Sequence, residues 1–227
     1  LVISDEINIC ETCDTGIGPH GITLDPDRNN FFTTSVVSDF LFKVDTETKN
    51  VINQISLTGA DVVPNNTGQL LKPIQCAMGG NEYIFVSCSG GELMDGGEVP
   101  GQIQMYNAET LELIDSYGLI GLDNNGFAID SRPWHIVVDS SKVYVALSGD
   151  MMMPLGQGIA SFSYDSDGLN LIWHLNDFIE MDDPHGIAIS NDGKTLFISD
   201  RGNGRLFIFN TETSQLIDDI NLSIMDI

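Results

Sequence analysis

Runs of alternating apolar and polar residues, each five to seven residues long, recur along the chain and are separated by turn residues. The first unit holds four such runs, at residues 19–25, 30–34, 40–45 and 51–57. They are rich in β-branched and aromatic residues, and Asp, Asn, Gly and Thr fill the intervals between them. This composition predicts four short strands in the unit. No stretch keeps a 3.6-residue period, so we expect no helix longer than about two turns.

The same pattern returns further along the chain. The opening Pro19-His20-Gly21-Ile22 reappears as Pro184-His185-Gly186-Ile187, followed by apolar runs at 195–199, 205–210 and 215–220. Two weaker copies begin at Pro73 and Pro133, so the leading prolines lie 54, 60 and 51 residues apart by subtraction of their numbers. Four-stranded units at about this spacing are typical of propeller blades.

We therefore predict an all-β fold, a β-propeller of four-stranded antiparallel blades. The blades are expected at about residues 19–57, 72–119, 132–178 and 183–223, within a propeller domain that covers residues 19–227. Residues 1–18 form a separate N-terminal segment, with a strand and a Cys-x-x-Cys motif. Four recognisable blades correspond either to a small ring or to part of a larger one.

These units resemble the YVTN/NHL-type β-propeller repeat, which opens on a Pro-x-Gly motif and closes its third strand with Asn or Asp, two residues and Thr. The order of features, a cysteine pair, a Pro-His-Gly blade and a Met-Met-Met-Pro loop, is also similar to secreted bacterial propellers with a methionine-rich loop. The resemblance covers the chain from Pro19 to Leu222. It implies the fold, whereas propellers of this type include binding platforms, lyases, lactonases and metal enzymes alike.

Charge excludes several partners. The 227 residues include 9 Lys and Arg against 33 Asp and Glu, a formal net charge of −24. Such a chain repels nucleic-acid phosphates and attracts metal cations or a basic protein partner. No uncharged apolar run approaches the roughly 18 residues of a membrane span, so we expect no membrane insertion. An acidic, apparently exported chain is expected in an extracellular or periplasmic location.

Propeller topology places the start of each first strand and the loop after each second strand on one face, called the top face below. Three of the four histidines, His20, His135 and His185, lie one or two positions after a strand-opening proline. The tract Met151, Met152 and Met153 follows a second strand. Imidazole and thioether ligands together suit copper(I), so these six residues are our candidate metal ligands. The alternatives are that the imidazoles fix inter-blade loops and that the methionines cap the channel.

Carboxylates are a further candidate set at the top face. Asp200 is assigned with the three histidines as a ligand-binding residue, and it stands near Asp150, Asp182 and Asp183 in the expected fold. Oxygen-rich loops of this kind suit calcium, which is the alternative cofactor to copper. No Asp-x-Asp-x-Asp-Gly loop makes a calcium site specific, and a solvated acidic rim is the other interpretation.

The cysteines divide into two groups. Cys10 and Cys13 form a Cys-x-x-Cys motif followed by Asp14, which disfavours haem attachment. A local disulfide, a metal pair with His20 and a redox pair stay open, and the disulfide suits an exported chain. Cys76 aligns with Ile22, Ile136 and Ile187 and is expected to be a buried free thiol.

The candidate residues favour a non-catalytic binding module whose top face takes a small ligand or a metal ion. The runner-up is a lyase or lactonase that uses a divalent metal in the central channel. Such an enzyme requires carboxylates or amides at several first-strand starts, where this chain has His20, Ile74, Trp134 and His185. A structural or adhesive surface repeat protein is the third reading.

Overall fold

The computed structural model describes residues 6, 7, 9, 18–57, 71–92, 98–122, 128–149, 156–176 and 181–222. Within these ranges the chain forms strands and turns and contains no helix, as its sequence pattern predicts. No helix in the described ranges is long and apolar enough to cross a membrane.

Four antiparallel four-stranded sheets make up the fold, and we call them blades 1 to 4. Blade 1 consists of β1 (Pro19–Leu24), β2 (Asn30–Ser35), β3 (Phe40–Asp45) and β4 (Val51–Ser56); blade 2 of β5 (Pro73–Gly79), β6 (Tyr83–Cys88), β9 (Gln102–Asn107) and β10 (Leu113–Gly118). Blade 3 consists of β13 (Pro133–Val138), β14 (Lys142–Ser148), β15 (Gln157–Asp165) and β16 (Gly168–Asn176); blade 4 of β17 (Pro184–Ile189), β18 (Thr195–Asp200), β19 (Arg205–Asn210) and β20 (Leu216–Asn221). Two small hairpins, β7 (Gly91–Glu92) with β8 (Glu98–Val99) and β11 (Ile120–Leu122) with β12 (Ala128–Asp130), extend blade 2 and the connection to blade 3.

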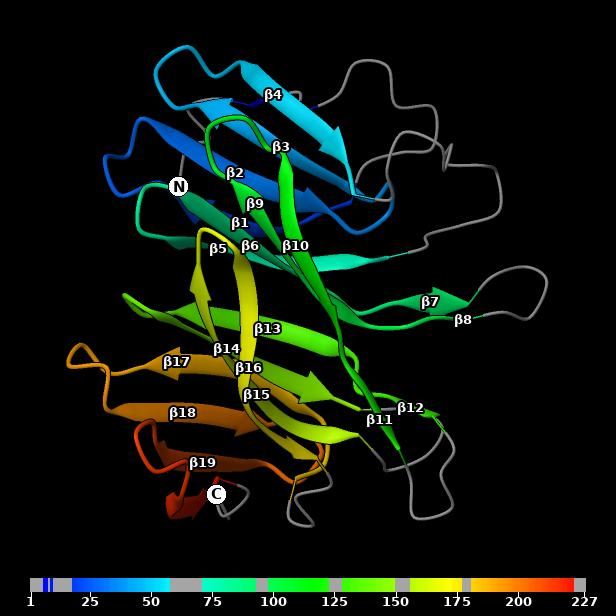
Figure 1. Ribbon diagram of the computed structural model, residues 1–227, viewed down its shortest axis with the longest axis vertical. Coiled ribbons are helices and arrows are strands. Elements are labelled where there is room, and N and C mark those ends of the chain that lie inside the picture. The colour runs from blue at the N-terminus through cyan, green and yellow to red at the C-terminus, as the bar shows by residue number, and fades with distance from the viewer. Residues whose placement is uncertain are drawn as a thin grey trace.

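The blades follow one another in chain order along the molecule. Figure 1 shows blade 1 at one end, blade 4 at the other and the two middle blades between them. The first strands β1, β5, β13 and β17 pack side by side in that order, so each is the inner strand of its blade. This is the arrangement of a propeller with four blades.

Three hydrophobic clusters hold the blades together, one at each junction. Between blades 1 and 2, Phe32 and Leu41 pack against Ile84, Val86 and Tyr106. Equivalent clusters join Phe85 and Ile103 of blade 2 to blade 3, and Tyr144 and Ile159 of blade 3 to blade 4. The core therefore lies between the sheets and is divided into three separate parts.

Cys76 belongs to the first of these clusters, where it is 1% exposed and unpaired, which confirms the expectation of a buried free thiol. It lies opposite Val86 on the neighbouring strand. Burial raises the pKa of the Cys76 thiol to about 12. Cys88 is also buried and free.

A repeated turn connects the third and fourth strands of blades 1, 2 and 4. The side-chain oxygen of Asp45, Asn107 or Asn210 accepts a hydrogen bond from a backbone N–H three residues later, at 2.6 to 2.9 Å. Such side-chain to backbone bonds replace the missing ladder bonds of a tight turn. They explain why Asn or Asp ends the third strand in these three units.

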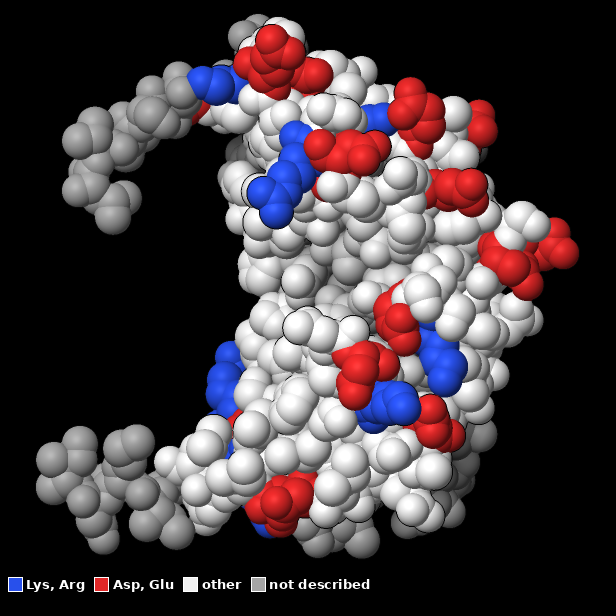
Figure 2. Space-filling view, turned by 90° about the vertical axis from the view of Figure 1, so that its left-hand side faces the viewer, with Lys and Arg blue, Asp and Glu red and all other residues white. Residues whose placement is uncertain are grey.

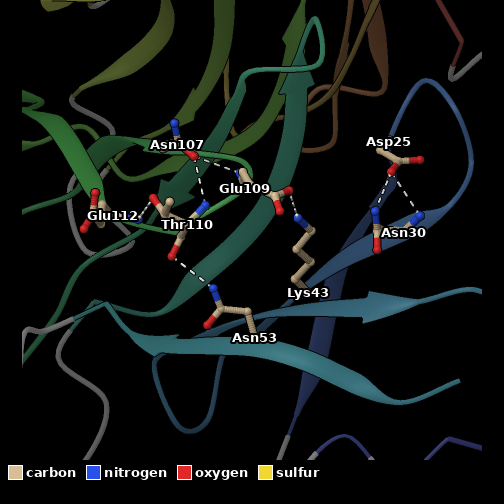
Figure 3. Close-up of polar contacts among 8 residues, drawn as sticks. All are labelled: Asp25, Asn30, Lys43, Asn53, Asn107, Glu109, Thr110 and Glu112. Atoms are coloured by element: carbon tan, nitrogen blue, oxygen red, sulfur yellow. Dashed lines mark hydrogen bonds and ion pairs between the residues drawn. The ribbon is translucent and has the colours of Figure 1, made fainter. Parts of the chain in front are cut away.

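Polar contacts between blades 1 and 2 lie beside one of these turns. Figure 3 shows the Lys43 side chain of β3 reaching Glu109 in the β9–β10 turn, with Asn53 of β4 directed at Thr110. The Nζ of Lys43 lies 2.6 Å from a Glu109 oxygen, and the lysine side chain is 6% exposed. This contact lowers the pKa of Glu109.

The top face is fixed by a backbone pattern that repeats in all four blades. The N–H of the residue after each second strand donates to the carbonyl of the residue before the inner strand, as Val36 does to Gly18 and Arg201 to Asp183. The β7–β8 hairpin, which follows β6, projects on the right of Figure 1 and marks this face. The start of each inner strand and the loop after each second strand thus lie together.

Candidate functional site

Two of the predicted histidines form a pair at the junction of blades 3 and 4. The ring centroids of His135 on β13 and His185 on β17 lie 4.8 Å apart, with the rings at 74°. Relative to the opening proline, His135 is one residue further along its strand than His185. Each inner strand changes register just after its proline, between Pro133 and Ile136 on β13 and between Pro184 and Gly186 on β17. Such bulges turn side chains away from strict alternation.

His20 has a different environment. Its Nδ1 donates to the carbonyl oxygen of Ile74 in the next blade, at 2.7 Å. This bond fixes the contact between blades 1 and 2, as the structural alternative for these histidines anticipates. Because Nδ1 carries the proton, Nε2 of the neutral ring keeps its lone pair. The His20 ring reaches the pair only through Trp134, whose ring lies 6.2 Å from His20 and 5.0 Å from His185.

Both imidazoles of the pair are held in the neutral form. Burial lowers the pKa of His135 from 6.5 to about 4, and the positive charges that His185 and His20 would carry add to the shift. Burial also lowers the pKa of His185, with a contribution from Arg201 that Asp183 partly opposes. Neutral imidazoles offer a lone pair to a metal ion or to a ligand hydroxyl.

A pocket of about 400 Å³ opens beside the pair on the top face. It lies between blades 3 and 4, and Trp134 lines it as well as contacting His185. Its lining consists of Arg132, Trp134, Ser148, Gly149, Gln157, Asp182, Asp183, Arg201 and Gly202. A cavity of this volume with a few convergent polar groups is the usual form of a small-molecule site.

Backbone bonds and one glycine shape the loops of the pocket. Arg201 pairs through Nε with Asp183 at 2.5 Å, and the N–H of Gly202 donates to the Asp182 carbonyl at 2.7 Å. A Cβ on Gly202 would lie 2.1 Å from that carbonyl oxygen, so only glycine allows this approach. Ser148 Oγ donates to the Pro184 carbonyl at 2.9 Å and ties blade 3 to blade 4.

Trp134 carries the clearest unused hydrogen-bonding group of the pocket lining. Its Nε1 is buried and has no hydrogen-bond partner within the described residues. A buried indole N–H normally finds an acceptor. An oxygen of a bound molecule would satisfy it.

Asp200, assigned with the histidines as a ligand-binding residue, supports a loop instead of lining the pocket. Its side chain accepts the N–H of Asp182 at 2.6 Å and of Asn203 at 3.2 Å, and the residue is 3% exposed. Burial raises the pKa of this carboxyl, and the N–H donors oppose the shift. Asp200 thus shapes the segment that carries Asp182 and Asp183.

Several predicted site residues cannot be placed. Met151, Met152 and Met153, and likewise Asp150, Cys10 and Cys13, lie outside the described residues. Gly149, which lines the pocket, directly precedes the methionine tract. Across the described ranges, no group of three or more His, Cys, Asp or Glu side chains is arranged to hold a metal ion.

Sequence reasoning missed the arginines, Gln157 and the role of Trp134. Arg132 and Arg201 are two of only nine basic residues, and each occupies the top end of a blade, Arg132 before β13 and Arg201 after β18. That coincidence in a chain of net charge −24 is the signal that was available. The aromatic residue at the His20 repeat position was a second signal.

The opposite, bottom face offers less. Figure 2 views this face, which carries the β1–β2 and β17–β18 turns, and shows Lys and Arg side chains next to Asp and Glu side chains. A polar cavity of about 200 Å³ lies there, between blades 1 and 2 beside Lys43 and Glu109. Its Asp25 already accepts both the backbone and side-chain N–H of Asn30 through Oδ2.

Comparisons with known proteins agree with the fold. Residues 181–209 match the model of the NHL repeat, so the propeller repeats are of the NHL type. No curated protein is significantly similar in sequence. Solved structures that match include the dihydro-haem d1 dehydrogenase NirN in complex with DHE, at 15% identity and a TM-score of 0.62 over 92% of this chain and 38% of that one.

Two matching structures are described as lactonases. The periplasmic gluconolactonase PpgL of Pseudomonas aeruginosa is 14% identical over 90% of this chain and 54% of its own, with a TM-score of 0.62. A putative 6-phosphogluconolactonase of Bacteroides uniformis has the same identity and TM-score over 90% of this chain and 55% of its own. This chain therefore spans between about a third and somewhat over half of the structures it matches, and the likeness extends to the fold alone.

Proposed function

We propose that this propeller of NHL-type repeats is a binding module whose top-face pocket takes a small polar organic molecule. The observation that carries the proposal is the convergence of Trp134, Arg132 and Arg201 on one cavity between blades 3 and 4. The indole supplies an apolar surface and an unused N–H, and the guanidinium groups suit a carboxylate or hydroxyl oxygen. A sugar acid or its lactone has these groups on a ring that fits this volume.

The pocket contents define the first probes. Two of the structural matches are described as lactonases of gluconate derivatives, so sodium gluconate and glucono-lactone are the molecules to titrate. The chain has two tryptophans, at positions 134 and 173. Trp173→Phe leaves Trp134 as the only indole, and its fluorescence reports directly on the pocket.

Gluconate should change the fluorescence of the Trp173→Phe variant in a saturable way. Arg132→Gln in the same background should weaken binding by about 10-fold or more, because hydrogen bonds to a charged group contribute about 1.5–3 kcal/mol. Trp134→Phe, which keeps only Trp173, is the matched control and should show no saturable change. An unsaturated, identical response of both single-tryptophan variants would contradict the proposal.

The lactone titration separates binding from catalysis. A binding module leaves the rate of glucono-lactone hydrolysis at its spontaneous value in the same buffer. A protein-dependent rate that saturates with lactone would favour the enzyme alternative, the propeller lactonase.

A soft metal ion, copper first, is the second candidate ligand of this face. It rests on the neutral His135 and His185 rings, 4.8 Å apart. Methionines from the tract after Gly149 would complete a coordination set of the kind copper(I) prefers. Calcium is the alternative for the carboxylates of the rim.

Calorimetric titration with copper(I), zinc(II) and calcium(II) tests the metal proposal. His135→Ala with His185→Ala should reduce copper(I) affinity by at least about 100-fold, and His174→Ala on the outer strand β16 should not. Equal losses in both, or no copper(I) binding by the parent, would remove the metal site. We place the protein outside the cytoplasm, in line with its acidic composition and the periplasmic gluconolactonase among its structural matches.

A further inference from the structure

The two end blades present surfaces that the middle blades bury. In this propeller each blade has a trailing face, packed on the next blade in the chain, and a leading face, packed on the blade before it. The three hydrophobic clusters are contacts between a trailing face and a leading face. In the described residues, the trailing face of blade 4 and the leading face of blade 1 belong to none of these clusters.

Repeat positions show what the trailing face of blade 4 is built for. The position of Phe197 on β18 is occupied in the other blades by Phe32, Phe85 and Tyr144, and that of Leu206 on β19 by Leu41, Ile103 and Ile159. These six equivalents are 0–1% exposed, whereas Phe197 and Leu206 are both partly exposed. An end repeat of an isolated array normally carries polar residues on its outer face. Blade 4 keeps the apolar residues of an inter-blade contact.

The leading face of blade 1 shows the same mismatch along its inner strand. Ile22 on β1 is 62% exposed and Leu24 is 51% exposed. The equivalents of Ile22 in blades 2 and 3, Cys76 and Ile136, are each 1% exposed because the preceding blade covers them. On the same face, Phe42 of β3 is already buried, so the open part is the inner strand.

We propose that a second copy of this chain covers both faces, so that two copies close a ring of eight blades. A trailing face requires a leading face as its partner, and the chain has one open face of each kind. Blades 1 and 4 lie at opposite ends of the molecule, so they do not meet within one copy (Figure 1). A twofold axis places blade 4 of each copy on blade 1 of the other in two identical contacts.

Two further observations support a second copy as the occupant. The lactonase structures that this chain matches are about twice as long, so the matched propellers contain about as much chain again. The residues of the two faces named here are uncharged, although each chain carries a net charge of −24. The charge opposes dimerisation from a distance and is screened by salt. The dimer should therefore strengthen as the salt concentration rises.

Light scattering after size-exclusion chromatography measures the result directly. At about 100 µM protein and about 0.5 M NaCl, the 227-residue chain should have a mass of about 49 kDa, twice its 24.7 kDa. A monomer under these conditions overturns the proposal. Larger, polydisperse assemblies overturn it too, because they indicate contacts that do not close.

Charge variants locate the contact. Ile22→Glu on the leading face and Ala188→Arg on the trailing face replace exposed residues, so neither leaves a cavity. Each alone should raise the dimer dissociation constant by about 10-fold or more, since a charge then faces an apolar surface. Leu113→Glu on β10, at a residue 53% exposed, is the matched control and should leave the dimer intact.

The double variant tests the geometry itself. The equivalents of these two positions meet in the existing junctions, where Ala77 packs in the same cluster as Ile136 and Val137 in the same cluster as Ile187. Ile22→Glu combined with Ala188→Arg therefore places opposite charges together across the proposed contact. It should restore the dimer relative to either single variant. Dimers that survive both single changes, or that the double change weakens further, would show that the copies associate elsewhere.

Discussion

Acidification should destabilise this protein through His135 well above the pH at which its carboxylates titrate. The folded-state pKa of His135 is about 4, below the ordinary value of 6.5, chiefly because the ring is buried. Between these two values the unfolded chain binds a proton that the folded chain does not. The free energy of unfolding therefore falls as the pH falls through this window, and it is fully retained above pH 6.5.

The size of the effect follows from the same two values. At about 1.4 kcal/mol per pH unit, the interval from 6.5 to about 4 sets an upper limit of about 3 kcal/mol. The ring is partly exposed, and water screens the charge it would carry, so we expect about 1–2 kcal/mol. The pKa of His185 is lowered in the same direction and adds to the slope.

Urea unfolding at several pH values between 7.5 and 5, with a chelator present, measures this dependence. His135→Gln supplies the comparison, because blade 2 carries Gln75 at the equivalent position and glutamine does not titrate. The parent should lose about 1–2 kcal/mol more than the variant over this range. Parallel pH profiles for the two proteins would refute the assignment of a low pKa to His135.

Three further predictions concern the junctions between blades. Gly21→Ala should lower the free energy of unfolding by about 1–3 kcal/mol, because its Cβ would lie 2.4 Å from the backbone of the next blade, whereas Gly118→Ala, with nothing within 4 Å, should be neutral. Lys43→Met should leave stability within about 1 kcal/mol or raise it, since blade 2 has a buried methionine at that position and replacing a buried ion pair by an apolar residue is often neutral. The thiols of Cys76 and Cys88 should resist a thiol reagent at pH 8 in the native protein and react after unfolding, because burial raises both pKa values.

Each of these has a clear contrary result. Equal losses for the two glycine variants in denaturant titrations would mean that the close approach at β1 is not real. A loss of several kcal/mol for the lysine variant would assign the ion pair a net stabilising role. Rapid reaction of a native thiol would place that cysteine at the surface.

The blade architecture could be predicted because the sequence repeats its own evidence. A single run such as 205–210 does not distinguish a central strand from other short apolar segments, but four aligned units do. The alignment also identified Cys76 as a core residue, since its equivalents are Ile22, Ile136 and Ile187. Repetition at that level survives local irregularity.

The candidate site could be predicted only in part. The sequence brought His20, His135 and His185 to one face, whereas the bulge after each proline pairs His135 with His185 and leaves His20 bonded to Ile74. The pocket lining comes from loops of two blades that are distant in the sequence. Arg132 and Arg201 each look like an ordinary surface residue until the blades are stacked.

The division of the core into three separate junctions also determines how this protein comes apart. Each cluster joins only neighbouring blades, so stability is close to a sum of nearest-neighbour couplings, as in other repeat proteins. Middle blades are held on two sides and end blades on one. Amide hydrogens should therefore exchange fastest in blades 1 and 4 and slowest in blades 2 and 3, and a lesion at one junction should release the outer blades without melting the whole array.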